Sequence, residues 1–267
     1  EAISDEEYVV NYCKKNNIKC YVKRIDVKNY ANNNKQGTEE AGRTVRYKFF
    51  DDILEKENAN KIAIAHNKND KIETIIMNML RGSGVSGLRG IEPKRNNKYI
   101  RPLIEIQRTQ IEEYCLENNL EPRIDKTNFI NDCTRNKIRN IVIPYIKKEF
   151  NPNIINTIDR LSSVIEEEDK YLEKVTNESF DRLKIKEEKG LIILNLKEFN
   201  KQDRVIKKRL IIYTINKTIG NVQNIEKVNI DDIIKLCDKN IGNKYLMPNK
   251  NIKILVNKNQ IFFESKF

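Results

Sequence analysis

The sequence predicts an α/β fold with parallel strands in its first half. Two observations support this prediction: helical and strand-like segments alternate through the first hundred residues, and the strand-like runs are short and apolar. Alternation of this kind is typical of parallel strands joined by right-handed crossovers. Ligands of such sheets bind at the carboxyl ends of the strands, so polar residues that follow a strand are the first candidates for a site.

Capping and periodicity place the first elements. A capping box at Ser4–Glu7 predicts a helix that ends before Asn16. The run 20–25 predicts a strand, and apolar residues along one stripe predict a second helix over 39–56.

A short apolar run over 62–65 predicts the next strand, and a third helix is expected to begin at Asp70. The residues expected on its inward face are Ile72, Ile75, Ile76, Met79 and Leu80. Because this helix follows the strand directly, the polar residues between them are expected in a crevice at the edge of the sheet.

The second half of the chain predicts a different architecture. Pro144 and Asn151–Pro152 predict a linker into a helical domain, and the final segment predicts the start of a C-terminal α+β domain. The expected elements are a long helix over 154–183, a strand over 191–196, helices over 202–215 and 230–236, and a hairpin over 252–263. The expected domains are residues 1–145, 146–218 and 219–267.

Composition narrows the class of partner and of location. The 267 residues include 50 Lys and Arg against 39 Asp and Glu, a formal charge of +11 that favours a polyanionic partner but also fits a Lys-rich solvated surface. The five cysteines form no C-x-x-C pair, so neither a zinc knuckle nor a disulfide framework is predicted. No long apolar run and no leader pattern occurs, so we expect no membrane partner and a cytoplasmic protein.

Polar groups gather where the strand 62–65 ends. His66, Asp70 and Glu73 follow it within eight residues. Asp70 and Glu73 can also act only as helix N-terminal residues that complement the macrodipole, and His66, the single histidine, can be a polar loop residue.

Two further patterns suit an anionic ligand. Glycines close the third helix in the turn Arg81, Gly82, Ser83 and Gly84, where a backbone can approach a ligand, although helix termination alone explains them. This turn lacks the P-loop and dinucleotide patterns. Arg43, Arg46 and Tyr47 occupy neighbouring helix positions, as solvated helix charges also would.

A basic segment, 121–148, carries seven basic and three acidic side chains. Its candidate residues are Asp125, Asn128, Arg135, Asn136, Arg139 and Lys147. Arginine forks bind phosphate through two parallel hydrogen bonds, although a salt-bridged helix face fits the same spacing.

Taken in order, these segments resemble the tRNA(Ile)-lysidine synthetase family. The matching segments are residues 1–2, 37–47, 66–74, 81–87, 101–103, 125–128 and 135–139, with Pro144. The resemblance implies a Rossmann-like PP-loop ATPase domain that uses ATP and Mg²⁺ and forms a carbon–nitrogen bond. It implies two partners, a tRNA(Ile) with a CAU anticodon and free L-lysine, and it leaves a homodimer open.

The resemblance also implies roles. Catalytic roles fall on His66, Asp70, Glu73 and Arg135. Cofactor binding falls on Arg43, Arg46, Arg81, Gly82, Ser83 and Gly84. Binding of tRNA or lysine falls on Asp125, Asn128, Asn136, Arg139 and Lys147. Beyond the matching segments, the basic residues Lys207, Lys208 and Arg209 of a later helix are also expected on the tRNA-facing surface, because they flank the linker between the catalytic and helical domains.

Two departures from the family pattern matter. The S-G-G-x-D-S loop that binds ATP does not occur in this sequence, and Glu1 corresponds to a point after the family's second strand. The family's H-H-x-D-D-Q stands here as His66-Asn67-Lys68-Asn69-Asp70-Lys71. We therefore expect a piece trimmed at both ends, a sheet without its first strands, and no lysidine synthesis by this chain alone.

Three alternatives stay open at this stage. A PP-loop tRNA thiolase would share the sheet but is expected to carry paired cysteines, which this sequence lacks. A non-catalytic tRNA-binding module fits the charge and the missing loop. The third is a basic α/β domain with no tRNA role.

Overall fold

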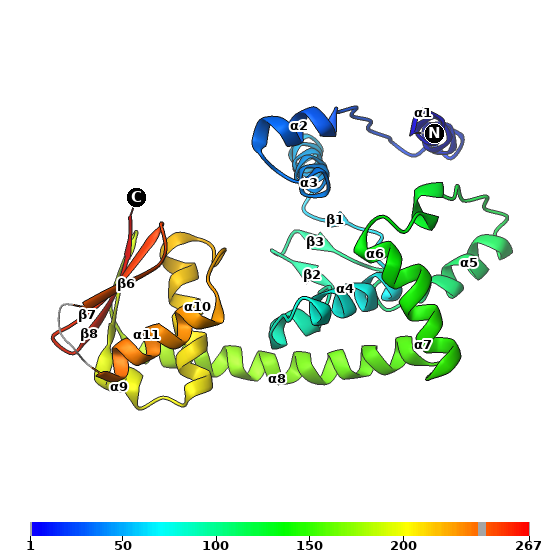
Figure 1. Ribbon diagram of the computed structural model, residues 1–267. Coiled ribbons are helices and arrows are strands. Elements are labelled where there is room, and N and C mark those ends of the chain that lie inside the picture. The colour runs from blue at the N-terminus through cyan, green and yellow to red at the C-terminus, as the bar shows by residue number, and fades with distance from the viewer. Residues whose placement is uncertain (1, 240–243, 267) are drawn as a thin grey trace. The chain divides into compact units, whose positions relative to one another are not determined.

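The chain divides into two compact units, residues 1–165 and 166–267 (Figure 1). The computed structural model describes residues 2–239 and 244–266, so Glu1 and Phe267, the outermost residues of the expected domains, lie outside it. The division differs from the three domains expected. The boundary expected at 218/219 falls inside the second unit, because a strand near residue 191 joins the same sheet as the C-terminal hairpin.

Three helices open the first unit: α1 (Ala2–Lys15), α2 (Val27–Asn34) and α3 (Thr38–Lys56). The helices α1 and α3 were expected, whereas α2 was not; its N-cap is Asp26, whose side chain accepts a hydrogen bond from the backbone of Asn29. The strand expected over 20–25 was wrong, since this segment pairs with no strand in the described part of the chain. β-Branched residues alone do not make a strand without a neighbour.

A small mixed sheet follows, built from β1 (Ile62–Ala63), β2 (Lys94–Arg95) and β3 (Tyr99–Ile100) in the order β1-β3-β2. The strands β1 and β3 are parallel, as the α/β prediction requires, and β2 is antiparallel to β3. The backbone nitrogen of Ile64 also donates to Ile100, so the pairing extends toward His66.

The helix α4 (Lys68–Leu80) carries the first unit's core. It begins two residues earlier than expected, because Asn67 and Asp70 form a capping box. Ile72, Ile75 and Ile76 are buried as expected, but Met79 and Leu80 are 59% and 64% exposed. These two lie in the last turn, after which Gly82 takes a positive φ of 73° and the chain turns away.

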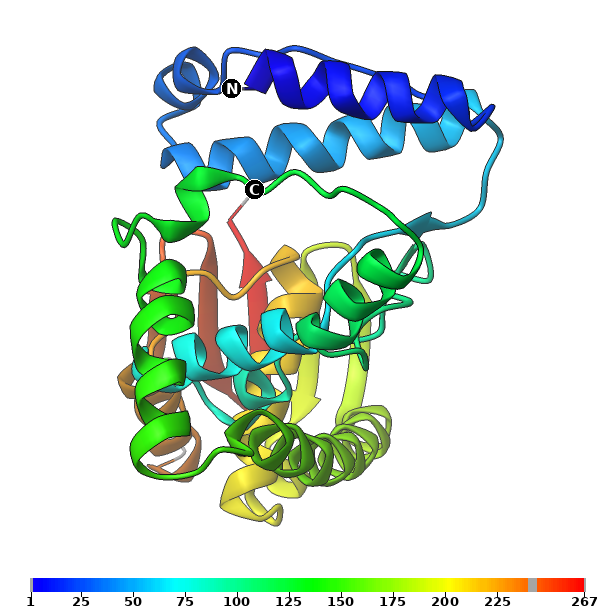
Figure 2. The ribbon, with the colours of Figure 1, turned by 90° about the vertical axis from the view of Figure 1, so that its right-hand side faces the viewer.

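A continuous helical stretch lies where a linker was expected. It comprises α6 (Thr134–Lys137), the π-helical turn η3 (Ile138–Val142) and α7 (Ile143–Glu149), and Figure 2 shows it in green beside α4 in cyan. Pro144 stands in the first turn of α7, where its missing N–H is tolerated. The remaining elements of this unit are η1 (Val85–Arg89), α5 (Arg108–Glu117) and η2 (Lys126–Phe129).

The second unit is one antiparallel sheet with helices packed on it. Its strands are β4 (Lys184–Glu188), β5 (Leu191–Asn195), β6 (Lys244–Asn249), β7 (Ile252–Asn257) and β8 (Gln260–Ser265), in the order β4-β5-β8-β7-β6. Its helices are α9 (Leu196–Asn200), α10 (Arg204–Ile219) and α11 (Lys227–Lys239). The long helix α8 (Ile154–Leu183) begins in the first unit and ends in this one. Among the described residues, every helix is too short or too polar to cross a bilayer.

The basic residues of α10 are all engaged within this unit. Lys207 pairs with Asp238 at 3.1 Å, Lys208 pairs with Asp231 at 3.3 Å, and Arg209 pairs with Asp169. The carboxylate of Asp169 is fully buried. Removing the cation from a buried ion pair strongly destabilises the folded protein.

Arg209→Ala is therefore expected to destabilise the chain by about 3 to 5 kcal/mol, because it removes a cation from beside a buried carboxylate. Urea unfolding monitored by circular dichroism measures this. The matched control is Lys208→Ala, whose pair is more exposed and whose loss is expected to cost about 1 kcal/mol or less. Equal effects of the two variants would contradict the argument.

Candidate functional site

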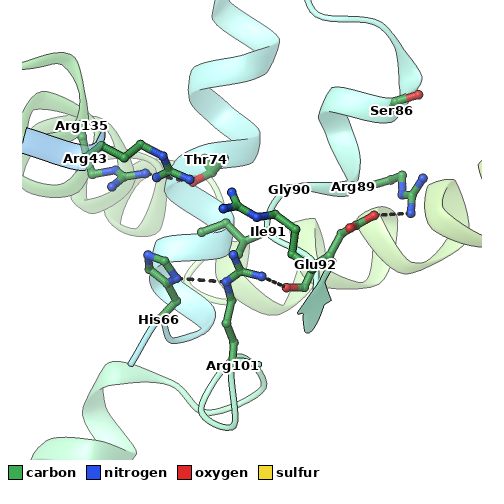
Figure 3. Close-up of a pocket in the computed structure, with 11 residues that line it drawn as sticks. Arg43, His66, Thr74, Ser86, Arg89, Gly90, Ile91, Glu92, Arg101 and Arg135 are labelled. Carbon is green, nitrogen blue, oxygen red and sulfur yellow. Dashed lines mark hydrogen bonds and ion pairs between the residues drawn. The ribbon is translucent and has the colours of Figure 1, made fainter. Parts of the chain in front are cut away.

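The first unit contains a cavity of about 380 Å³ that we call the arginine cavity (Figure 3). Its charged and polar lining includes Arg43, His66, Thr74, Arg89, Glu92, Arg95, Arg101 and Arg135. Five guanidinium groups thus face a single carboxylate, which leaves a formal excess of four positive charges when the histidine is neutral. An enclosed excess of this kind attracts anions.

Arg101 fixes His66 at one wall of this cavity. The Nε of Arg101 donates to Nδ1 of His66 at 3.1 Å, and its Nη1 donates to the backbone oxygen of Glu92 (Figure 3). Since Nδ1 accepts a hydrogen bond, the proton of the neutral imidazole lies on Nε2. Arg101 itself is only 6% exposed.

The charge state of His66 follows from the same surroundings. Burial lowers the pKa of His66 below its ordinary value, and the guanidinium groups of Arg101, Arg135 and Arg43 lower this pKa further, against the carboxylate of Asp70, which raises it. The imidazole is therefore neutral at pH 7 and can donate from Nε2.

Arg135 also lines this cavity. Its Nη2 donates to Oγ1 of Thr74 at 3.1 Å, and its Nε lies 3.8 Å from the Glu73 carboxylate without a hydrogen bond. The hydroxyl of Thr74 in turn donates to the backbone oxygen of Asp70 at 2.8 Å. Arg135 is thus held in place while one buried donor remains without an acceptor.

A second cavity, of about 570 Å³, is called here the carboxylate cavity. Its lining includes Asn67, Asn69, Asp70, Glu73, Arg108, Glu112, Asn128, Phe129, Arg139 and Lys147. Arg139 organises it: Nε and Nη2 bind the two carboxylate oxygens of Glu73 at 2.6 and 2.8 Å, and Nη2 reaches Asp70 at 3.2 Å. Such two-point pairing fixes both side chains.

The pair of Glu73 and Arg139 stays ionised. Burial by itself raises the pKa of the Glu73 carboxyl, and the guanidinium of Arg139 opposes this rise. The hydrogen bonds to Glu73 raise the pKa of Arg139 further above its ordinary value. Because a bidentate guanidinium compensates the buried carboxylate, we regard both groups as charged.

One helical turn connects the two cavities. Arg135 and Arg139 are four residues apart on the stretch 134–149, yet Arg135 lines the arginine cavity and Arg139 lines the carboxylate cavity. The same holds on α4, where Thr74 lines the first cavity and Glu73 the second. A ligand in either cavity therefore contacts the same pair of helical elements.

A known protein family matches the first unit of the chain. A family profile described as "PP-loop domain" matches residues 1–146. The chain belongs to the PP-loop domain family.

The PP-loop chain is also similar to curated proteins along most of its length. A tRNA(Ile)-lysidine synthase from Clostridium acetobutylicum is 45% identical over 249 residues, 93% of this chain and 53% of the relative. Another from Clostridioides difficile is 40% identical over 266 residues, 100% of this chain and 58% of the relative. A third, from Geobacillus kaustophilus, is 29% identical over 259 residues. The chain spans about half the length of the curated relatives it matches.

The PP-loop unit brings together some of the expected site residues. His66, Arg43 and Arg135 share the arginine cavity, whereas Asp70, Glu73, Asn128, Arg139 and Lys147 line the carboxylate cavity. One crevice was expected for His66, Asp70, Glu73 and the turn 81–84. Instead His66 lines one cavity, Asp70 and Glu73 line another, and the turn lines neither, because α4 turns successive side chains to different sides.

Other expected residues lie elsewhere. Arg81, Gly82, Ser83 and Gly84 form an exposed turn after α4 and line neither cavity, and the exposed Arg46 also lies outside both. Asp125 caps η2, and Asn136 donates to the backbone oxygens of Thr127 and Ile130. Lys207, Lys208 and Arg209 belong to the second unit.

Sequence reasoning missed Arg95, and it used Arg101 only as part of a matching segment. Arg95 is brought to the cavity by the hairpin of β2 and β3, whose turn residues Asn96 and Asn97 both have positive φ. Asparagine adopts positive φ more readily than most residues, so these two neighbouring asparagines were a turn signal that sequence reasoning left unused.

The single histidine gives a direct test of the arginine cavity. Proton NMR should show the His66 imidazole titrating below 6.5 in the folded chain and near 6.5 in the urea-unfolded chain. Because the unfolded state then binds the proton more readily, stability should fall as the pH drops below about 6.5. Asp70→Asn should lower the midpoint further, since Asp70 raises it. A folded midpoint at or above the unfolded one would contradict this geometry.

Proposed function

We propose that this chain is part of an enzyme that makes lysidine in tRNA(Ile). The observation that carries the proposal is the 45% identity to a tRNA(Ile)-lysidine synthase across 93% of the chain, which includes both compact units. In the proposed reaction, the carbonyl oxygen of the wobble cytosine attacks the α-phosphate of ATP and pyrophosphate leaves. The ε-amine of lysine then attacks the activated carbon and AMP leaves. The enzyme is thus a ligase that forms a carbon–nitrogen bond.

The arginine cavity is proposed to hold the anionic part of ATP. Its excess positive charge fits phosphate oxygens, and so does the Nε of Arg135, which lacks a hydrogen-bond acceptor. A phosphate can accept two hydrogen bonds from one guanidinium. The neutral His66 can donate to the same group. These contacts matter because phosphoryl chemistry depends mainly on position and electrostatics.

Magnesium is proposed to enter with the nucleotide. The described residues contain no group of three His, Cys, Asp or Glu side chains that could form a metal cage. Mg²⁺ commonly binds through substrate phosphates and one or two carboxylates, and such binding needs no cage of protein ligands. Bound in this way, the ion would neutralise the charge of the triphosphate.

The carboxylate cavity is proposed to receive lysine. Asp70, Glu73 and Glu112 offer oxygen acceptors for an ammonium group, while Arg139 and Lys147 can attract a carboxylate. Lysine carries both groups. Because α4 and the stretch 134–149 line both cavities, the same two elements would bind the lysine and the phosphates of ATP.

The tRNA is proposed to approach the basic segment 121–148, where Lys147 opens onto the carboxylate cavity. Contact by Lys207, Lys208 and Arg209, also proposed, would require their ion pairs to open. A cytoplasmic location and a homodimer are further parts of the proposal.

Lysine transfer tests the proposal. A full-length protein that contains this chain should transfer radiolabelled lysine to a tRNA(Ile) transcript with a CAU anticodon in an ATP-dependent way. Glu73→Gln should lower this transfer by about 100-fold, because it releases Arg139 from its fixed position. The matched control, Glu113→Gln, changes an exposed carboxylate on α5 and should leave transfer unchanged.

Each outcome has a meaning. Binding of tRNA without any lysine transfer would favour a non-catalytic module, and transfer of sulfur would favour a thiolase. Normal transfer by a correctly folded Glu73→Gln protein would remove Glu73 from the proposed machinery.

A further inference from the structure

One arginine of the arginine cavity, Arg95, packs against two aromatic rings. The guanidinium carbon of Arg95 lies 4.7 Å from the ring centroid of Tyr47 and 5.0 Å from that of Tyr99. The two rings meet edge to face, with centroids 5.0 Å apart at 68°. Arg95 thus packs into the corner formed by the rings, an arrangement that stabilises a cation without neutralising it.

The same tyrosine also holds Arg43. The guanidinium of Arg43 lies 4.8 Å from the Tyr47 centroid, and its Nη2 donates to the Tyr47 hydroxyl at 3.4 Å. Both arginines line the cavity. A single ring therefore positions two cations toward one small volume.

The aromatic platform is fixed from behind. Tyr99 is 4% exposed, and its hydroxyl donates to Asp51, which also pairs with Lys98 at 2.7 Å. Burial, together with the hydrogen bond to Asp51, raises the pKa of Tyr99 to about 12. The ring stays a neutral phenol at physiological pH, so the platform carries no charge of its own.

Arg95 is left with unused donors. Its Nε is buried and lacks a hydrogen-bond partner, and no carboxylate among the described residues forms an ion pair with its guanidinium. Buried donors without acceptors are unfavourable, and side chains seldom remain so unless a ligand or water supplies the acceptor. The rings keep the guanidinium in place for such an acceptor.

The charge of the cavity narrows the class of ligand. Five guanidiniums and one carboxylate surround about 380 Å³, and the carboxylate, Glu92, is already paired with Arg89. A nucleic-acid backbone brings one negative charge per phosphate, spread along the chain. A diphosphate concentrates several charges in a small volume, which matches this cavity better.

We propose that Arg95, positioned by Tyr47 and Tyr99, is a phosphate-binding residue that holds the pyrophosphate portion of the nucleotide and the pyrophosphate that leaves it. The inference rests on the proposed function for the origin of the pyrophosphate. The binding of a diphosphate in the arginine cavity can be tested without measuring lysine transfer.

The test is isothermal titration calorimetry of the 267-residue chain with sodium pyrophosphate. Arg95→Ala should weaken binding by about tenfold or more, since hydrogen bonds between charged groups are lost. Arg95→Lys should also weaken binding, because lysine keeps the charge but loses the planar fork and the stacking. The matched control is Lys94→Ala, which removes an exposed charge from the neighbouring position of β2 and should change the affinity less than about twofold.

Tyr47 supplies the test of positioning. Tyr47→Leu should weaken pyrophosphate binding about as much as Arg95→Ala, whereas Tyr47→Phe keeps the ring and should restore most of the affinity. If Tyr47 had only a structural role, the Tyr47→Leu and Tyr47→Phe proteins would not differ in pyrophosphate affinity in this way. Thermal unfolding of each variant shows that folding is intact, and Arg95→Lys replaces Arg95→Ala if the latter fails to fold.

Two results would overturn the proposal. One is pyrophosphate affinity that is unchanged in both Arg95→Ala and Arg95→Lys. The other is an Arg95→Ala protein that binds pyrophosphate as the unchanged chain does but binds single-stranded RNA more weakly. That result would assign the cavity to a nucleic-acid backbone. Lysine transfer by the full-length protein is measured separately, so failure of the diphosphate proposal and failure of the enzyme proposal give different results.

Discussion

The ion pair between Glu73 and Arg139 is the interaction on which the first unit's site depends. It joins α4 to the helical stretch 134–149 through two hydrogen bonds to a carboxylate that is almost completely buried. Buried pairs of this kind add little net stability, but they define a geometry strictly, because either partner alone would be an uncompensated buried charge. The orientation of these two elements, and with it the relation between the cavities, follows from that constraint.

The two cavities differ in how their charges are balanced. In the carboxylate cavity, Asp70, Glu73 and Glu112 stand against Arg108, Arg139 and Lys147, so the formal charges of the lining balance. In the arginine cavity, the guanidiniums outnumber the carboxylates, and cation–π contacts take the place of ion pairs around Tyr47. Because these guanidiniums are not neutralised, their positive charge remains available to attract an anionic ligand. The neutral His66 adds a hydrogen-bond donor to the cavity and no further charge.

The second unit shows the opposite use of charge. Its basic residues on α10 are paired with carboxylates of the same unit, and the strongest case, Arg209 with Asp169, is largely buried. Its core is apolar and continuous, formed by the sheet and the helices α10 and α11. Here charged groups contribute to a single well-defined packing, whereas in the first unit they surround open cavities.

Local sequence patterns determined the elements whose signals are complete within one segment. The helix α3 and the long helix α8 follow from apolar periodicity, and the hairpin of β7 and β8 follows from two apolar runs around a polar turn. The ordered polar motifs also indicated the PP-loop family. His66, Asp70 and Glu73 were predicted at the end of β1 because strand order alone puts the following residues at the edge of the sheet.

Tertiary structure alone decided which of these residues share a cavity. Arg43, Arg95 and Arg135 come from segments far apart in the sequence, and they meet only because the fold brings α3, the hairpin of β2 and β3, and α6 to one cavity. The run 20–25 has strand-like composition but, within residues 2–239 and 244–266, no strand pairs with it, whereas 184–188 becomes a strand by pairing with β5. Hydrogen bonding and burial depend on partners supplied by distant parts of the chain, so a local pattern does not specify them.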